Sequence, residues 1–78
     1  MHMFEKIAEI IAEQLNVDVE NITMETNMKE DLGADSLDLF ELVTALEDEY
    51  GIDIDSEDLV SLTTVKAVME YLNQKGIN

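Results

Sequence analysis

Cysteine is absent from this sequence, and histidine occurs once, at His2. The chain therefore has no disulfide framework and no thiolate metal site, and one histidine leaves no zinc ligand set. We interpret residues 1–2 as a remnant of recombinant expression, where an ordered catalytic partnership is not expected. Stability must come from packing alone, in a single domain that we assign to residues 1–78.

Long apolar runs are also missing. No stretch approaches the roughly 18 residues that a membrane-spanning helix needs, and there is no signal-peptide pattern. We therefore expect a soluble, intracellular protein without stable membrane insertion. Bases are scarce, with four lysines against 19 acids and a net charge of -15. Because such a charge repels itself, we expect marginal stability that improves with salt or divalent cations.

The acids are concentrated in the middle of the chain, where twelve lie between Lys29 and Lys66 with no base among them. Such a surface repels phosphate backbones and anionic lipids, so binding to nucleic acid or to a membrane surface is disfavoured. Basic protein surfaces are the natural partners. The alternative is an acidic surface that serves only solubility.

Hydrophobic periodicity predicts an all-α fold. Apolar residues recur at helical spacing over residues 3–15, and residues 36–50 contain neither glycine nor proline. A third helix follows residues 63–64, and a short one lies near residues 56–60. We predict a small helical bundle of three main helices plus one short helix, with a long loop after the first helix. Residues 17–19 and 52–55 alternate like strands but are too short for a sheet, and we interpret them as loop.

Local signals place the ends of these elements. Gly51 and Ile52 suit a Schellman-type end for the second helix. Asn27 and Glu30 have the spacing of a capping box for one turn inside the long loop, which would bury Met28 and Leu32. The remaining predicted caps are Ser56 for the short helix and Thr63 or Thr64 for the last helix.

A single serine stands at the junction between this loop and the second helix, in the run Asp35-Ser36-Leu37. Either Asp35 or Ser36 can cap the helix, and a helix N-terminus also suits a phosphate group. Ser36 is therefore either an ordinary cap or a residue placed to carry a phosphoester. Nucleophilic catalysis is disfavoured, because no base is at hand and the Gly-x-Ser-x-Gly elbow is absent.

The second helix has two different faces on a helical wheel. The predicted core face carries Leu39, Leu42, Val43, Leu46 and Tyr50. The opposite face carries Leu37, Phe40, Glu41, Thr44, Glu47 and Asp48. Two large apolar residues thus lie among acids directly after Ser36. This combination favours a docking surface, in which apolar anchors give affinity and acids orient a basic partner.

The ordered motifs resemble those of acyl carrier proteins, most closely the free-standing type of fatty-acid synthesis. The resemblance spans nearly the whole chain and rests on these segments: Glu30-Asp31-Leu32-Gly33-Ala34-Asp35-Ser36-Leu37-Asp38, Glu41-Leu42-Val43, Leu46-Glu47-Asp48-Glu49-Tyr50-Gly51-Ile52, Asp55-Ser56-Glu57-Asp58, Thr63-Thr64-Val65 and Tyr71-Leu72.

This resemblance implies that a phosphopantetheinyl transferase (holo-synthase) attaches 4′-phosphopantetheine from coenzyme A to Ser36. The terminal thiol of the attached phosphopantetheine then holds acyl groups as thioesters. The carrier has no catalytic activity of its own. The resemblance also implies that Asp35 and Asp38 orient the transferase and its magnesium, with no specific metal site in the carrier itself. Fatty-acid synthesis enzymes with basic docking surfaces would meet Leu37, Phe40, Glu41, Thr44, Glu47 and Asp48. We expect a monomer in the bacterial cytoplasm rather than in an organelle.

In similar carriers the acyl chain slips between the helices. The candidates for lining that pocket are Met28, Leu32, Leu39, Val43, Leu46, Ile54, Leu59, Leu62 and Val68, all of which could equally be core. Fatty-acid carriers commonly have smaller side chains at the positions of Leu39, Phe40 and Leu59. We therefore expect a shortened pocket, or an altered partner preference at Phe40.

Several alternatives remain open from the residues. Carriers for polyketide, specialised lipid or alanine-transfer pathways share the architecture, although Ala34 and Asp35 argue against peptidyl carriers. From a different class, Asp53 and Asp55 start an EF-hand-like spacing, but Asp58 replaces its glycine and Thr64 its last glutamate. Only weak divalent-cation binding would follow from that reading. A helical domain used purely for protein interaction would leave the Asp-Ser-Leu junction without a purpose.

Overall fold

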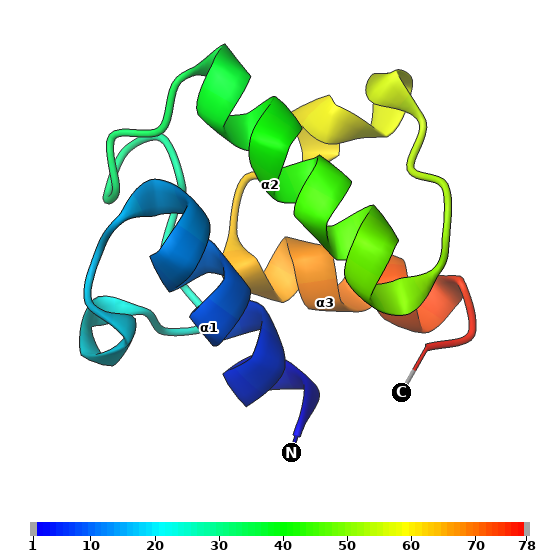
Figure 1. Ribbon diagram of the computed structural model, residues 1–78, viewed down its shortest axis with the longest axis horizontal. Coiled ribbons are helices and arrows are strands. Elements are labelled where there is room, and N and C mark those ends of the chain that lie inside the picture. The colour runs from blue at the N-terminus through cyan, green and yellow to red at the C-terminus, as the bar shows by residue number, and fades with distance from the viewer. Residues whose placement is uncertain (1, 78) are drawn as a thin grey trace.

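The computed structural model describes residues 2–77, which form three α-helices and two short 3₁₀-helices (Figure 1). In chain order these are α1 (Met3–Leu15), η1 (Val19–Asn21), α2 (Ser36–Tyr50), η2 (Ser56–Ser61) and α3 (Val65–Gln74). The predicted all-α bundle, with its long loop after the first helix, is confirmed, and η1 is a further short turn inside that loop. None of the helices within these residues is long and apolar enough to cross a membrane.

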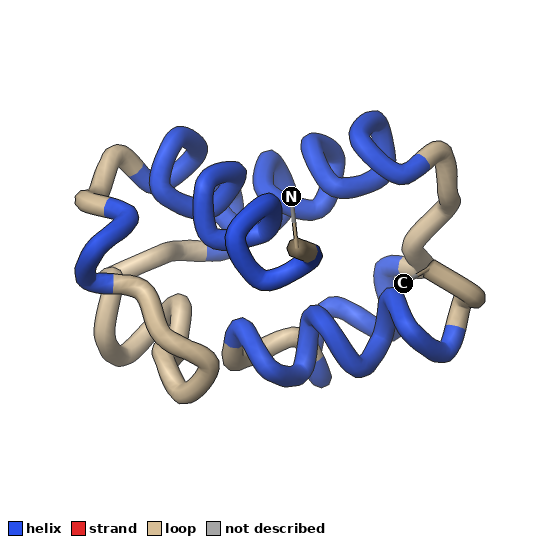
Figure 2. The backbone as a smooth tube through the Cα atoms, turned by 90° about the horizontal axis from the view of Figure 1, so that it is seen from below, coloured by secondary structure: helices blue, strands red, loops and turns tan. Residues whose placement is uncertain are grey.

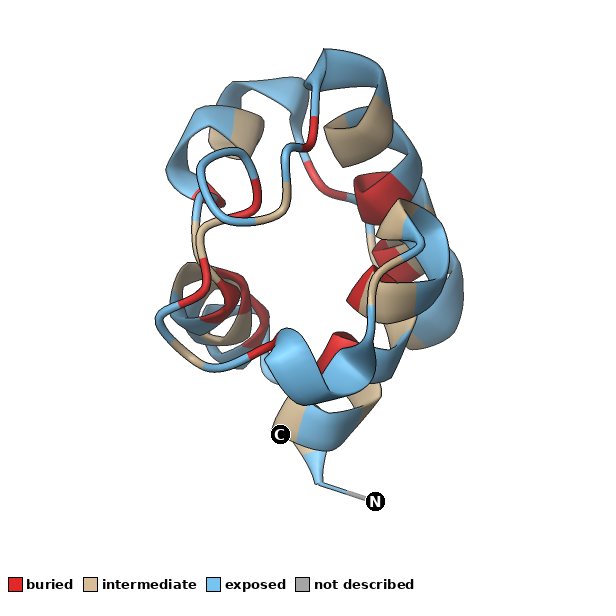
Figure 3. Cartoon of the chain, turned by 90° about the vertical axis from the view of Figure 1, so that its left-hand side faces the viewer, coloured by how far each residue is buried: buried red, intermediate tan, exposed pale blue. Residues whose placement is uncertain are grey.

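The three α-helices enclose one hydrophobic core. In Figure 2, α2 and α3 lie on opposite sides of the molecule, and α1 contacts both of them. Figure 3 shows that the buried positions of the helices face the interior. The largest buried side chains come from every α-helix and from the long loop: Ile7, Ile11, Met28, Leu42, Leu46, Leu72, Val65 and Val68. The apolar positions of residues 3–15 pack in or against this core, and the core face predicted for the second helix is confirmed.

The helix α2 begins and ends with well-defined caps. At its C-terminus Gly51 has a φ of 65°, a left-handed conformation that glycine adopts without a steric penalty. The carbonyl of Glu47 accepts hydrogen bonds from the N–H groups of Gly51 (2.8 Å) and Ile52 (3.3 Å). The predicted Schellman-type end is therefore confirmed, and it turns the chain sharply toward η2.

The predicted capping box in the long loop has a different partner. The Asn27 Oδ1 atom accepts from the N–H groups of Lys29 (3.0 Å) and Glu30 (2.9 Å), as an N-cap does. The reciprocal bond to the Asn27 N–H comes from Asp31 Oδ2 at 2.8 Å, so the prediction of Glu30 in this role was wrong. The shorter aspartate reaches back because it lies one residue further round the turn. Met28 is buried as predicted, whereas Leu32 is only half-buried.

Backbone hydrogen bonds connect this loop to the start of α3. The N–H of Met28 donates to the carbonyl of Thr63 (2.9 Å), and the N–H of Val65 donates to the carbonyl of Thr26 (3.1 Å). Between them lies an isolated antiparallel bridge that pairs Asn27 with Thr64. The loop is thereby held against the segment between η2 and α3, which fixes one wall of the site described below.

Of the caps predicted for the last two helices, the one for α3 is confirmed and the one for η2 is wrong. Thr64 Oγ1 accepts from the N–H of Ala67 at 3.1 Å, so the predicted cap of α3 is confirmed. The prediction that Ser56 caps the short helix was wrong, because Asp55 occupies the N-cap position and, within residues 2–77, no side chain makes the capping hydrogen bond. The helix there is a 3₁₀-helix, with three residues per turn rather than 3.6.

Candidate functional site

Ser36 is the first residue of α2, and its side chain is exposed. The cap is made instead by Asp35 Oδ1, which accepts from the N–H of Asp38 at 2.8 Å. Asp38 Oδ2 returns the bond by accepting from the N–H of Asp35 at 3.1 Å. The interpretation of Ser36 as an ordinary cap was therefore wrong. Its hydroxyl makes no hydrogen bond within residues 2–77 and stands free beside the N-terminus of a fifteen-residue helix.

The chain reaches Ser36 through a turn with a fixed shape. Gly33 has a φ of 70°, a left-handed conformation that strains most other residues. Its N–H donates to the carbonyl of Lys29 (3.1 Å), and the next N–H, of Ala34, donates to the carbonyl of Met28 (3.0 Å). The buried methyl group of Ala34 then packs in the core. Ser36 is thus held by a hydrogen-bonded turn on one side and a capped helix on the other.

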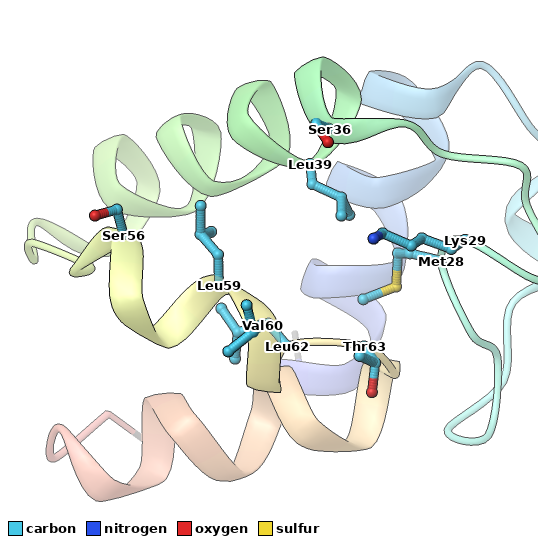
Figure 4. A pocket seen from close by; sticks show the side chains of 9 residues that line it. All are labelled: Met28, Lys29, Ser36, Leu39, Ser56, Leu59, Val60, Leu62 and Thr63. Carbon is cyan, nitrogen blue, oxygen red and sulfur yellow. The ribbon is translucent and has the colours of Figure 1, made fainter.

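A cavity of about 260 Å³ opens next to Ser36 (Figure 4). Ser36 and Leu39 of α2 form one side, η2 and the residues after it form the other, and the long loop closes one end. The lining residues are Met28, Lys29, Ser36, Leu39, Ser56, Leu59, Val60, Leu62 and Thr63. The volume exceeds the roughly 150 Å³ of an apolar protein cavity that binds benzene. A hydrocarbon chain of moderate length therefore fits beside the serine.

A much smaller void lies behind this cavity, on the side of the core. Leu39, Leu59 and Leu62 line both spaces and so form the partition between them. The void measures about 10 Å³, which is at the lower limit for a single water molecule. The cavity can deepen toward the core only if these leucines change position.

The structure divides the predicted pocket residues into three groups. Met28, Leu39, Leu59 and Leu62 line the open cavity. Val43, Leu46 and Val68 line only the small inner void. Leu32 and Ile54 line neither space and pack with the hydrophobic core. The separation arises because Leu39, Leu59 and Leu62 stand between the two spaces.

Four lining residues were missed by the sequence reasoning: Lys29, Ser56, Val60 and Thr63. Ser56 and Thr63 were considered only as helix caps. Lys29 was counted only as a charge, and Val60 only as part of a short turn. The 3₁₀ geometry of η2 leaves Val60 83% exposed at the cavity. A helix with 3.6 residues per turn would have assigned its side chains to other faces, so the sequence carried no clear signal for this position.

Most residues of the predicted docking face of α2 are exposed in the structure. Leu37 and Phe40 are 64% and 59% exposed and lie one turn apart on the same helix, so they form a pair of exposed apolar side chains. Most of the predicted polar partners are exposed as well: Asp35, Glu41, Thr44 and Asp48. Two carboxylates differ, since Asp38 is half-buried in the capping box and Glu47 is turned toward the next loop. Glu47 Oε2 accepts from the N–H of Ile54 at 2.7 Å, so that carboxylate is partly committed to the fold.

The wall formed by η2 is attached to α3 through Tyr71, whose hydroxyl donates to Asp58 Oδ2 at 2.8 Å. Partial burial, the hydrogen bond to Asp58 and the negative charge of that carboxylate raise the pKa of Tyr71, although nearby Lys75 acts in the opposite direction. Burial, followed by the charge of Glu49, also raises the pKa of Tyr50. The Tyr50 hydroxyl is buried and has no hydrogen-bond partner within residues 2–77.

The EF-hand-like spacing that starts at Asp53 and Asp55 was the basis for the divalent-cation alternative. Across residues 2–77, no three histidine or acidic side chains come together as a set of metal ligands. The exposed serine, the capped helix and the apolar cavity lie side by side at the start of α2. They are what a covalently attached arm with an apolar cargo would require.

Comparison with known proteins agrees with this reading. Residues 5–72 match the family described as phosphopantetheine attachment site. The acyl carrier protein of Syntrophobacter fumaroxidans is 55% identical over 67 residues, which cover 86% of this chain and 83% of that protein. The one from Thermosynechococcus vestitus is 45% identical over 73 residues, covering 94% and 90%.

The chain is also similar to solved structures of acyl carrier proteins. The acyl carrier protein from Enterococcus faecalis superposes with a TM-score of 0.76 at 37% identity, over 91% of this chain and 90% of that one. A Mycobacterium tuberculosis protein assigned as an acyl carrier protein gives a TM-score of 0.86 at 38% identity, over 95% and 99% of the two chains. The chain therefore belongs to the acyl carrier protein family, and the resemblance seen in its motifs is confirmed. It carries acyl chains on 4′-phosphopantetheine and has no catalytic activity of its own.

Proposed function

We propose that Ser36 is the residue to which 4′-phosphopantetheine is attached, and that the adjacent cavity receives the acyl chain. The observation that carries this proposal is the free Ser36 hydroxyl at the mouth of an apolar cavity, with the helix cap provided by its neighbour. The chain has two other serines, Ser56 and Ser61. The Ser61 hydroxyl already donates to the carbonyl of Asp58 at 2.7 Å, and neither serine begins an α-helix.

In the attachment step the Ser36 oxygen forms a bond to the phosphorus that carries the pantetheine group of coenzyme A. The bond from that phosphorus to the adenosine 3′,5′-diphosphate leaving group breaks, and a base of the transferase takes the serine proton. The N-terminus of α2 favours the resulting negative phosphodiester. The arm supplies the thiol on which acyl groups are held, which this cysteine-free chain lacks.

We propose that Asp35 and Asp38 orient the transferase and its magnesium. Each carboxylate uses one oxygen in the capping box, which leaves the other oxygen of each outside that reciprocal pair. The exposed docking face of Leu37, Phe40, Glu41, Thr44 and Asp48 would then meet successive enzymes through apolar anchors and acidic contacts. Glu47 would contribute to that face mainly by holding the loop at Ile54 in place.

The pathway we propose is fatty-acid synthesis in the bacterial cytoplasm, with the carrier acting as a monomer. The bacterial acyl carrier proteins that the chain resembles support this assignment. A specialised lipid or polyketide pathway is the second candidate. It is favoured by the leucine partition, which limits the present cavity to chains of moderate length.

The attachment site is tested by incubating the protein with coenzyme A, magnesium and a broad-specificity phosphopantetheinyl transferase, followed by intact-mass measurement. We expect a gain of one phosphopantetheinyl group in the wild type and in Ser56→Ala, and no gain in Ser36→Ala. Ser56→Ala is a matched control because Ser56 is exposed and lines the same cavity. Modification that persists in Ser36→Ala would refute the assignment.

A further inference from the structure

Lys29 is the only charged residue among those that line the cavity beside Ser36. In Figure 4 its amino group points into the space below Ser36 and Leu39. The lysine comes from the long loop, whereas the serine begins α2, so the fold brings together two residues from different elements. A cation at this position is unexpected in a chain with four bases and 19 acids.

The Lys29 ammonium has neither an ion pair nor a hydrogen bond within residues 2–77. The ion pair found there joins Lys6 Nζ to Glu49 at 3.2 Å, on the α1–α2 contact. Of the neighbouring acids, Asp31 already directs Oδ2 back to the N–H of Asn27. The charge of Lys29 is therefore available to a ligand that enters the cavity mouth.

The backbone at Lys29 is fixed on both sides. Its N–H donates to Asn27 Oδ1 at 3.0 Å, and its carbonyl accepts from the N–H of Gly33 at 3.1 Å. The preceding residue, Met28, is buried and bonded through its own N–H to Thr63. The lysine therefore extends from a rigid base, and less conformational freedom is lost when its ammonium binds an anion.

We infer that Lys29 is the counter-ion of the phosphodiester on Ser36 and directs the attached arm toward the cavity. This inference rests on the proposed attachment at Ser36. A phosphodiester there lies close to Asp35 and Asp38, which repel it, and Lys29 is the only base among the residues that share its cavity. An opposite charge on the cavity side of Ser36 favours an arm that leaves the serine on that side rather than along the acidic docking face.

The ligand chemistry is an anion on the attached arm, and two sources are conceivable: the phosphodiester itself, or a carboxylate at the end of a loaded acyl group. The phosphodiester is favoured because Ser36, which would carry it directly, lines the same cavity mouth as Lys29. The interaction between Lys29 and the phosphodiester must then stabilise the holo-protein that carries a bare thiol, before any acyl group is loaded.

The test compares the thermal midpoint Tm of apo- and holo-protein at low ionic strength, after mass spectrometry has verified modification. The quantity compared is the Tm of the holo-protein minus the Tm of the apo-protein. In Lys29→Met we expect this difference to be lower than in wild type by about 2–4 °C, the shift expected from one exposed ion pair in a domain of this size. Lys29→Gln should give the same loss and Lys29→Arg should restore the wild-type value. High salt should erase the difference between variants.

Lys66→Met is the matched control, because it also removes one exposed lysine but lies in α3 outside the cavity. It should keep the wild-type difference between apo- and holo-protein. Equal effects of Lys29→Met and Lys66→Met would overturn the inference, as would coupling that arises only after a carboxyacyl group is loaded. Failure of the proposed attachment is a separate result, since it would show as no serine-dependent gain in mass.

Discussion

The stability of the loaded carrier should rise with acyl-chain length and then level off where the cavity is full. A protein cavity of roughly 150 Å³ holds the six carbons of benzene, so the cavity of about 260 Å³ has room for about eight to ten carbon groups. Moving one methylene from water into an apolar site contributes about 0.8 kcal/mol, and 1 kcal/mol shifts Tm by about 4–8 °C in a domain of this size. The upper limit is therefore about 3–6 °C per methylene, reduced by the entropy of ordering the chain.

The assay is thermal unfolding of a series of loaded proteins, with acyl groups from four to twelve carbons linked through a hydrolysis-resistant amide. We expect Tm to increase up to about eight to ten carbons and to change little beyond that length. The small inner void gives the reason, because Leu39, Leu59 and Leu62 stand between it and the cavity.

Leu59→Ala tests whether that partition sets the limit. The substitution removes three carbon atoms and connects the cavity with the inner void, so the plateau should move to longer chains by about three carbons. The unloaded variant should be less stable by about 1–2 kcal/mol, less than a fully buried leucine because Leu59 is half-buried. Met69→Ala is the control, since Met69 packs against the core without lining either space. A plateau that is unchanged in Leu59→Ala, or a Tm independent of chain length, would refute the reasoning.

Three further predictions concern the cap, the tyrosines and the docking face. Asp35→Ala should lower the stability by about 1 kcal/mol in urea titrations, because it removes the cap of α2, and an unchanged midpoint would contradict the capping role. The pKa values of Tyr50 and Tyr71 are raised in the folded protein above the ordinary value of about 10. Their contribution to the free energy of unfolding is therefore complete below about pH 10, and it is lost as pH rises through the folded-state pKa, because the unfolded chain loses these protons first. The urea midpoint should therefore fall above pH 10, and Tyr71→Phe should make that fall smaller. Leu37→Ala should raise the KM of a partner enzyme by about tenfold without changing helical content, and unchanged kinetics would argue against docking at this face.

Much of this fold could be predicted from local patterns in the sequence. The bounds of α2, the caps at Gly51 and Thr64 and the core face of α1 depend on residues close together along the chain. The same holds for the exposure of Leu37 and Phe40, which follows from helical periodicity alone.

The features that were missed depend on contacts between distant segments. Lys29 lies at the cavity because the long loop is bonded to Thr63, and no periodic pattern encodes that pairing. Glu47 was assigned to the docking face, but the loop after Gly51 returns to bring the N–H of Ile54 to its carboxylate. Because η2 is a 3₁₀-helix rather than an α-helical turn, different side chains reach the cavity, and Val60 lies at its rim.

The central claim is that a chain attached at Ser36 enters the adjacent cavity rather than lying along the docking face. It is tested most directly by nuclear Overhauser contacts in protein loaded with an isotope-labelled eight-carbon acyl group. We predict contacts from the acyl chain to the side chains of Met28, Leu39 and Leu59, and none to Leu37 or Phe40. Contacts to Leu37 and Phe40 without any to the cavity residues would contradict the account.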